Sequence, residues 1–503
     1  MEHWRPAGNC ITMKIILPLL IFFSALLGFA QPDGGKKIII EDVPAVVQRS
    51  DFCGEACVEM YLKKLGSDIT QDEVFNVSGL DPVQGKGCYT GDLLKALGTL
   101  GFNLGDFSRI CPKVSPLKPE ESNKCFDEML ADLKIGIPSI VCMHYNEDAA
   151  SPEHFRLILG YDPNTDEIVY NEPAEQDGAY RKMKREIFLK LWPLKYAADE
   201  WTLVRIPLDV DKAKIKTPER KPPVVRKIMG RTGCIEEVKS LPFTNADYMQ
   251  HVRMLKDKYS DRKLHFIVQH PFVVTGDLDA LTMKGCSDKT IRWTVRMLMK
   301  SYFEFYPSRI LTVWLLKDAK SFNEYCELIT GDEPGTPYGF YSDRCDALIM
   351  NIGTGGGTLV HEIVHPFIEA NFPECPSWLN EGLGSLYEQS SERDGNIIGL
   401  TNWRLAGLQN AIKLKQLPDF ETLTGYDSLQ FYNTRKGDNY AQSRYLCYYL
   451  QEKGLLFKFY KEFHANCKED PTGYKSLMKI LGVKDMKKFQ EEWQKYVMKL
   501  TFP

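Results

Sequence analysis

The sequence lacks an excess of charge of either sign, a long apolar run beyond its first thirty residues, and any internal repeat. With 63 Lys+Arg against 67 Asp+Glu residues, the formal net charge is −4, so the basic surplus that binding to a phosphate backbone requires is missing. No stretch after residue 30 approaches the ~20 apolar residues of a transmembrane helix. These absences argue against a nucleic-acid-binding protein and predict no membrane span in the mature chain. With 44% hydrophobic residues, the chain is typical of a globular protein of roughly two or three domains.

The N-terminus has the pattern of a secretory signal peptide. A Met-Lys pair precedes the fifteen-residue apolar run at residues 15–29, and the small residues Gly28 and Ala30 occupy the positions that a signal peptidase recognises. We predict cleavage after Ala30, with residues 1–12 as an upstream extension, and an exported protein that is secreted or periplasmic. Removing Cys10 with the leader leaves 13 of the 14 cysteines, so at least one thiol stays unpaired in a monomer.

The rest of the chain divides at residues 208–240, a charged and proline-rich stretch that we predict to be an interdomain linker. In residues 31–207, helical patterns at 55–65, 91–100 and 123–134 precede strand patterns at 137–143, 155–161, 168–170 and 201–206. Helices first and strands second indicate an α+β domain. In residues 241–503, strand patterns at 264–269, 310–316 and 347–352 alternate with helical ones, and from about residue 401 the chain is mostly helical.

The most specific pattern in the second domain is H-E-I-V-H at residues 361–365. Residues four apart lie on one face of a helix, so both imidazoles can face one metal ion while Glu362 reaches a water bound to it. A catalytic zinc site needs a third protein ligand. The extended pattern with a third histidine is excluded, because Ile368 and Asn371 stand where Gly and His are required. A short helix that begins after Pro376 offers the carboxylate of Glu381 instead.

This region resembles the gluzincin metallopeptidases of the MA type. The resemblance rests on the strand at residues 347–352, the glycines after it, the histidine pair, and W-L-N-E-G-L at residues 378–383. It implies a zincin-like fold with a mainly helical C-terminal subdomain, Zn²⁺ as the cofactor, and an extended substrate along the strand before the glycines. The resemblance assigns His361, His365 and Glu381 as the three metal ligands and Glu362 as the general base.

Three neighbouring features each allow two interpretations. Pro366 disfavours helical geometry in the residue before it, so we expect the helix to kink or end there; a helix with two surface histidines and no metal is the competing interpretation. Tyr440 is a candidate to stabilise an oxyanion, or else a core residue of an aromatic-rich helix. The glycine-rich run at residues 353–358 lacks the Gly-Lys-Ser/Thr of a nucleoside-triphosphate loop, and we interpret it as a turn that permits close approach.

The first domain carries a different set of reactive residues. Cys53 lies at the start of a predicted helix, where the peptide dipoles favour a thiolate. His154, at the start of a predicted strand, is the candidate base, and Asn171 on the next strand is placed to hold the imidazole by its ring N–H. His144 competes for the role of base. Cys57, one helical turn after Cys53, is interpreted as a packing residue or a disulfide partner.

The order Gln48, Cys53-Gly-x-Ala, His154-x5-Gly-Tyr and Asn171-x-Pro resembles the C39-like branch of papain-fold cysteine peptidases over about residues 40–207. The resemblance implies a papain-like fold with Cys53 as nucleophile, His154 as base, Asn171 as the orienting residue and Gln48 as the oxyanion donor. That family more often has Asp at the third position, although an amide performs the same role in related thiol enzymes.

We therefore predict an exported two-domain peptidase that acts on a peptide or protein substrate, with thiol chemistry in the first domain and zinc chemistry in the second. The first domain is alternatively an amidase or acyl transferase, because a Cys-His-Asn set serves any acyl-enzyme chemistry. Two further hypotheses are a first domain that only binds substrate beside an active zinc domain, and a binding protein with two vestigial sites. The sequence leaves the oligomeric state open.

Overall fold

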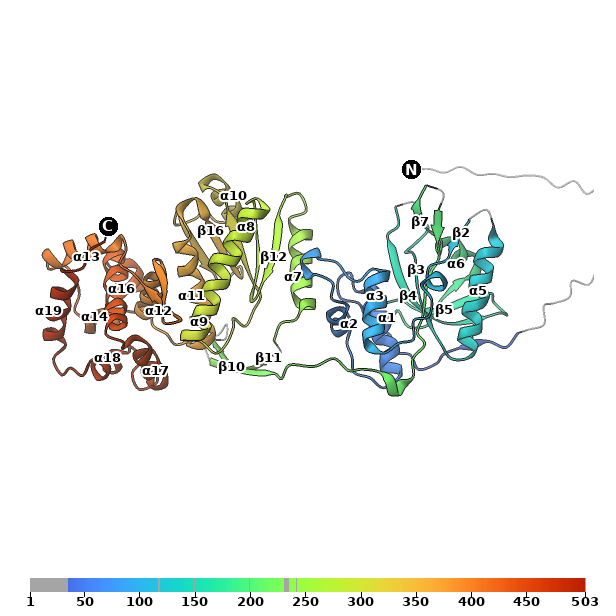
Figure 1. The fold of residues 1–503 in the computed structure, drawn as a ribbon, viewed down its shortest axis with the longest axis horizontal. Helices are drawn as coiled ribbons and strands as arrows, with labels where there is room; N and C mark the ends of the chain where they lie inside the picture. The colour runs from blue at the N-terminus through green and yellow to red at the C-terminus, as the bar shows by residue number, and fades with distance from the viewer. Residues whose placement is uncertain are drawn as a thin grey trace, which may run out of the picture.

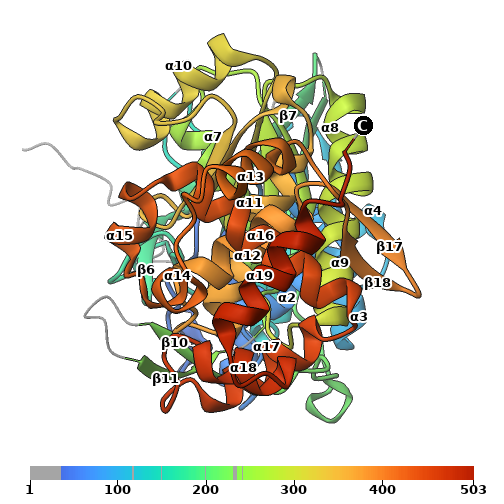
Figure 2. The same ribbon diagram turned by 90° about the vertical axis from the view of Figure 1, so that its left-hand side faces the viewer.

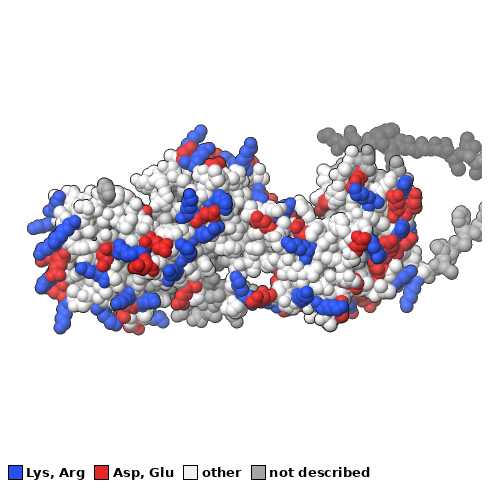
Figure 3. Space-filling model, viewed as in Figure 1, with Lys and Arg blue, Asp and Glu red and all other residues white. Residues whose placement is uncertain are grey.

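The computed structural model describes residues 35–115, 118–148, 150–198, 200–229, 235–240 and 242–502. These residues form two lobes that follow one another along the longest axis of the molecule (Figure 1). The predicted signal peptide lies outside the described residues. Among the helices that the structure describes, none is long and apolar enough to cross a membrane. On the face drawn in Figure 3, basic and acidic side chains are interspersed over both lobes.

The first lobe is built around an antiparallel sheet with the strand order β6-β5-β4-β3-β9, in which β1 also pairs with β4. The strands are β1 (Ile38–Ile39), β3 (Ser139–His144), β4 (Glu153–Asp162), β5 (Glu167–Asn171), β6 (Arg181–Lys184) and β9 (Val204–Pro207). A smaller sheet contains β2 (Lys113–Val114), β7 (Leu194–Ala197) and β8 (Glu200–Thr202). The predicted order of helices before strands is confirmed.

Alternation of side chains along β4 divides the core of this lobe in two. Phe155 and Leu157 pack with the helices on one face, whereas Ile158 packs with those on the other. The first face is covered by α1 (Cys53–Lys64), α2 (Gln71–Ser78) and α3 (Thr90–Leu100), and the second by α5 (Pro119–Lys134) and α6 (Arg185–Leu191). The apolar residues of α1 therefore bring its first residue, Cys53, against the sheet.

The second lobe contains a mixed five-stranded sheet of order β12-β13-β14-β16-β15. The central strands β13 (Phe272–Gly276), β14 (Leu311–Leu316) and β16 (Ala347–Asn351) are parallel, and the edge strands β12 (His265–Gln269) and β15 (Gly339–Ser342) are antiparallel to their neighbours. One face is covered by α7 (Asn245–Lys258) and α10 (Ala319–Thr330), and the other by α8 (Ala280–Cys286), α9 (Arg292–Ser301) and α11 (Gly357–Asn371). The edge strand β15 lies against α11 and pairs with β16 alone among the described strands.

The chain after α11 is largely helical, as predicted (Figure 2). Apart from the hairpin β17 (Ser390–Arg393) and β18 (Asn396–Gly399), it consists of α12 (Ser377–Tyr387), α13 (Arg404–Lys413), α14 (Phe420–Gly425), α15 (Ser428–Asn433), α16 (Lys436–Glu452), α17 (Leu456–Asn466), α18 (Tyr474–Leu481) and α19 (Met486–Val497). Helix α16 packs along α12 and shares one core with α11 and the central sheet.

The predicted linker at residues 208–240 contains regular structure that its sequence did not indicate. Strands β10 (Val224–Met229) and β11 (Ile235–Ser240) pair as an antiparallel hairpin. Helix α7 follows directly and lies between the second sheet and α2 of the first lobe (Figure 1).

Candidate active sites

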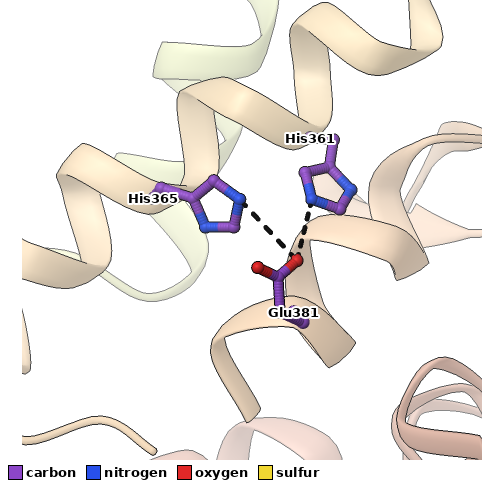
Figure 4. Close-up of side chains that lie close together, drawn as sticks. All are labelled: His361, His365 and Glu381. Carbon is purple, nitrogen blue, oxygen red and sulfur yellow. Dashed lines mark hydrogen bonds and ion pairs between the residues drawn. The ribbon is translucent and has the colours of Figure 1, made fainter. Parts of the chain in front are cut away.

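The second lobe brings together the three side chains predicted to bind a metal. His361 and His365 project from one face of α11, and Glu381 faces them from α12 (Figure 4). Glu381 Oε2 lies 3.1 Å from His361 Nε2 and 3.9 Å from His365 Nε2. One ligand atom from each of the three residues lies within 4.8 Å of the other two. Two imidazole nitrogens and one carboxylate oxygen thus converge on one point.

Pro366 does not disturb this arrangement. The sequence predicts a kink or an end of the helix at this residue, but α11 continues through it to Asn371, and His365 keeps its place above Glu381. Pro366 is itself buried, so packing around the helix outweighs the single backbone hydrogen bond that the proline removes. The expectation that the helix kinks or ends at Pro366 is therefore corrected.

Each ligand side chain is held by a second hydrogen bond on its far side. His361 Nδ1 lies 3.1 Å from Glu388 Oε1, and His365 Nδ1 lies 2.9 Å from Asn380 Oδ1. The hydroxyl of Tyr432 donates to Glu381 Oε1 at 2.6 Å. Such partners fix the orientation of both rings and turn each Nε2 toward Glu381, where the metal would bind. Sequence reasoning assigned none of these three partners, although Glu388 lies seven residues after Glu381, two helical turns along the same face.

The electrostatics of this cluster favour a cation. Burial opposes protonation of His361, but hydrogen bonds to Glu381 and Glu388 outweigh it and raise the pKa of this imidazole to about 10. Burial likewise opposes ionisation of Glu381, yet the neighbouring His365 and His361 lower its pKa to about 2. A site that holds a proton so strongly on an imidazole is rich in negative charge. Two histidines and a carboxylate are also a donor set that zinc takes in catalytic sites.

Glu362 lies between this cluster and the edge of the sheet. Its Oε2 accepts a hydrogen bond of 3.0 Å from the backbone N–H of Tyr341 on β15 and lies 3.7 Å from His365 Nε2. Burial raises the pKa of its carboxyl, which suits a group that takes up and releases a proton. The structure therefore puts the predicted general base beside the predicted ligands.

A cleft of about 2060 Å³ opens over these residues. Its lining includes residues of β15, the glycine-rich residues 354–357 and Tyr440. The ring of Tyr440 stacks with that of His361 at a centroid distance of 6.4 Å, and it also packs against the hydrophobic core. Both interpretations of this tyrosine thus describe part of its environment.

In the first lobe, Cys53 is the first residue of α1, as predicted, but its side chain is partly buried against the hydrophobic core. Burial raises the pKa of Cys53 to about 12, against the opposing effect of a hydrogen bond from the backbone of Phe155. The dipole effect expected at the helix start is therefore outweighed in this state. Phe155 directly follows His154, so the thiol meets the beginning of β4. Within the described residues, no hydrogen bond joins Cys53 to the His154 ring.

The residue that holds His154 is Glu172, not Asn171. His154 Nε2 forms a very short hydrogen bond with Glu172 Oε1, and Glu172 Oε2 accepts one of 2.7 Å from Arg156 Nε. The Asn171 amide instead donates to the Val43 carbonyl at 3.3 Å. Asn171 is the last residue of β5 and Glu172 the first residue beyond it, and their side chains have different hydrogen-bond partners. The orienting role predicted for Asn171 is corrected, and an acidic residue, which the resemblance led us to expect, stands one position later.

The other candidates of the first lobe are also located. The Gln48 backbone N–H donates to the Pro173 carbonyl at 2.8 Å, which places Gln48 beside the turn that carries Glu172. His144 contacts the Ser151 carbonyl through Nδ1 at 3.4 Å. Cys57 is fully buried and unpaired, consistent with a packing role.

Comparison with known proteins supports the assignment of the first lobe. Residues 40–198 match the model of the Peptidase C39 like family. The peptidase domain of Streptococcus ComA, a bi-functional ABC transporter involved in quorum sensing, is similar over 34% of this chain and 100% of its own, with 17% identity and a TM-score of 0.23. No curated protein matches the chain. The family match thus identifies a C39-like peptidase domain at residues 40–198 and does not extend to the second lobe.

Proposed function

We propose that the protein is an exported peptidase with two sites of different chemistry, a thiol site in the first lobe and a zinc site in the second. The thiol site is supported by the family match over residues 40–198 together with the His154–Glu172 pair beside Cys53. The zinc site is supported by one observation above all: His361, His365 and Glu381 converge within 4.8 Å of one another in a cleft.

In the second lobe, His361, His365 and Glu381 would hold the zinc. A bound zinc ion supplies an acidified water and polarises the carbonyl of the bond to be cut. Glu362 takes a proton from the attacking water and later delivers it to the leaving amine. The outer edge of β15 pairs with no described strand, so its backbone groups other than the Tyr341 N–H are offered to an extended peptide, which fits a peptide or protein substrate. Tyr440 lines the same cleft, and its hydroxyl would donate to the developing oxyanion.

In the first lobe, Cys53 Sγ attacks the carbonyl carbon of the substrate as His154 takes the thiol proton. The C–N bond then breaks, the imidazolium gives this proton to the leaving amine, and an acyl-enzyme remains on the sulfur. A water that His154 deprotonates hydrolyses the thioester and restores the thiol. Glu172 holds the imidazole in place throughout, and the Gln48 side chain is the oxyanion donor. The same steps serve an amidase, or an acyl transferase if an amine replaces water.

One observation favours a second candidate function. Burial raises the pKa of the Cys53 thiol to about 12, and no hydrogen bond joins it to His154 among the described residues, as expected for a lobe that binds substrate without cutting it. Under this second function only the zinc site is active. Turnover by Cys53→Ala decides between the two: unchanged cleavage supports the binding role, and loss of a subset of products supports the thiol peptidase.

The zinc site is tested by elemental mass spectrometry of the purified protein beside His361→Ala and Glu381→Ala. We expect one zinc per chain, lost in both variants, and loss of the corresponding peptide hydrolysis. As the matched control, His464→Ala removes a histidine that stacks with Tyr460 elsewhere in the same lobe and should leave zinc binding unchanged. A folded wild-type protein that takes up no zinc when the metal is supplied would remove the zinc part of the proposal.

A further inference from the structure

Helix α7 of the second lobe contacts the segment of the first lobe that leads into Cys53. Three successive residues of that segment meet three residues of α7. Arg49 Nη1 lies 3.4 Å from Asp247 Oδ1, the Ser50 carbonyl accepts a hydrogen bond of 2.9 Å from Gln250 Nε2, and Asp51 Oδ2 lies 3.3 Å from Arg253 Nη1.

The spacing of these contacts follows from the geometry of a helix. The three α7 residues are three positions apart, which puts them along one side of the helix. The adjacent apolar residues Ala246 and Met249 are fully buried and belong to the hydrophobic core of the first lobe. At the far end, Lys256 Nζ donates to the Gln84 carbonyl at 2.7 Å. Helix α7 is thus packed against the first lobe along its length, not touching it at one point.

The segment that α7 contacts, residues 49–51, is held in an uncommon backbone conformation. Asp51 has φ of +66°, a left-handed backbone that costs energy for a residue other than glycine. The backbone N–H of Gly87 donates to Asp51 Oδ2 at 3.0 Å, on the same oxygen that faces Arg253. A Cβ at Gly87 would lie 1.9 Å from the Asp51 carbonyl oxygen, so the two loops touch directly. Contacts from both lobes therefore hold the turn two residues before the thiol.

We propose that α7 is a positioning element of the thiol site, with Gln250 and Arg253 as its positioning residues. The segment that they hold has the oxyanion donor Gln48 at one end and the nucleophile Cys53 at the other. Gln48 and Cys53 must both lie at set distances from the carbonyl group of the bound substrate. A shift of the segment between them therefore lowers the reaction rate more than it weakens substrate binding. The thiol site is thereby complete only when the second lobe is docked. This inference rests on the thiol chemistry proposed above.

The test uses the full chain with Gln250→Ala and Arg253→Ala combined. Asp247 is left unchanged because it also accepts a hydrogen bond from the Thr244 N–H at the start of α7. Two readouts are needed: the rate at which iodoacetamide alkylates Cys53 as a function of pH, followed by peptide mass spectrometry, and kcat and KM for the hydrolysis that Cys53→Ala abolishes. We expect both the alkylation rate and kcat to fall about three- to tenfold, with KM nearly unchanged, since each contact is partly exposed.

Two control variants separate positioning from a general effect on α7. Lys258→Ala removes an exposed cation of the same helix that lies over the Tyr259 ring of its own lobe, and it should behave as wild type. Arg253→Lys, in an otherwise wild-type chain, keeps the charge opposite Asp51 and should retain most of the rate. If the double variant does not fold, Gln250→Ala alone removes only the hydrogen bond to Ser50.

Each result bears on a different claim. Wild-type rates and pH profiles in the folded double variant, or in Gln250→Ala if that variant is used, would overturn the positioning role while leaving the thiol chemistry in place. A wild-type protein without any Cys53-dependent hydrolysis would overturn the proposed thiol function itself. A fall in the alkylation rate and kcat of the double variant, with both retained in Arg253→Lys, supports the inference.

Discussion

Replacing Glu172 by glutamine is the most direct test of the thiol site, because the sequence and the structure point to different residues at this position. Glu172→Gln keeps the size of the side chain and removes its charge. The carboxylate is 2% exposed and bonded to both His154 and Arg156. A hydrogen bond to a charged group contributes about 1.5–3 kcal/mol. If that stabilisation of the imidazolium is lost, the reaction of Cys53 should slow about 10- to 150-fold.

The matched variant is Asn171→Ala, one residue earlier on the strand. The Asn171 amide bonds to the Val43 carbonyl and to the Tyr180 N–H, so its loss should lower the free energy of unfolding by about 1–3 kcal/mol. It should leave alkylation of Cys53 by iodoacetamide within about threefold of wild type, because it removes no contact of His154. The assay is the second-order alkylation rate at several pH values. Slow alkylation of Cys53 in Asn171→Ala, together with a wild-type alkylation rate in Glu172→Gln, would refute the reasoning and restore the assignment of Asn171 from sequence.

The same pair predicts a pH dependence of stability. Burial alone would raise the pKa of Glu172, but His154 and Arg156 outweigh it and lower the pKa below its ordinary value of 4.5. A carboxyl whose pKa is lower in the folded state stabilises the fold above the unfolded pKa, and this contribution is lost as pH falls through the folded value. The difference in unfolding free energy between wild type and Glu172→Gln should therefore be largest above about pH 4.5 and shrink below it. Urea unfolding across this range measures it; a constant difference would contradict the lowered pKa.

Three further predictions concern the second lobe. Gly384→Ala puts a Cβ 3.1 Å from the ring of His361 and should weaken zinc binding about tenfold or more. The control Gly407→Ala, whose Cβ would meet no atom within 4 Å, should leave zinc binding unchanged. Chelator competition measures the zinc affinity of both variants. Glu388→Gln, which removes the charge behind the same ring, should weaken zinc binding about 10- to 100-fold in that assay, and an affinity within about twofold of wild type would contradict the role assigned to this carboxylate. Removing zinc with a chelator should abolish hydrolysis by the second lobe while the alkylation rate of Cys53 stays unchanged, and a parallel fall in both would contradict two separate sites.

The parts of the sites that could be predicted from sequence are those set by local geometry. His361 and His365 are four residues apart, and helical periodicity alone puts them on one side of α11. Cys53 was recognised because its helix begins at that residue. Asn171 was chosen wrongly because a shift of one residue on a strand reverses the face, and neither the end of β5 nor its partner on β4 can be located that closely from sequence.

The remaining site residues depend on contacts between distant segments. Tyr432 reaches Glu381 from a different helix, about fifty residues along the chain, and no local pattern links the two. The contacts of α7 join residues that are still farther apart in the sequence: Gln250 and Ser50 are separated by 200 residues. The polar residues of α7 look like an ordinary solvent-exposed face in the sequence. Only the folded chain shows that this face is covered.

The packing of α7 also determines how the two proposed activities can be tested separately. Tyr248, Val252 and Leu255 belong to a core cluster of the second lobe, whereas Ala246 and Met249 lie in the core of the first. Cutting the chain within residues 208–240 would leave one side of α7 and its contact surface on the first lobe exposed to water. Isolated lobes would then lose stability, and the isolated first lobe would also lose the contacts of α7 that we propose to position the thiol site. Whether the two sites act on one substrate is therefore better asked of the full chain, with Cys53→Ala and Glu362→Gln each silencing one site.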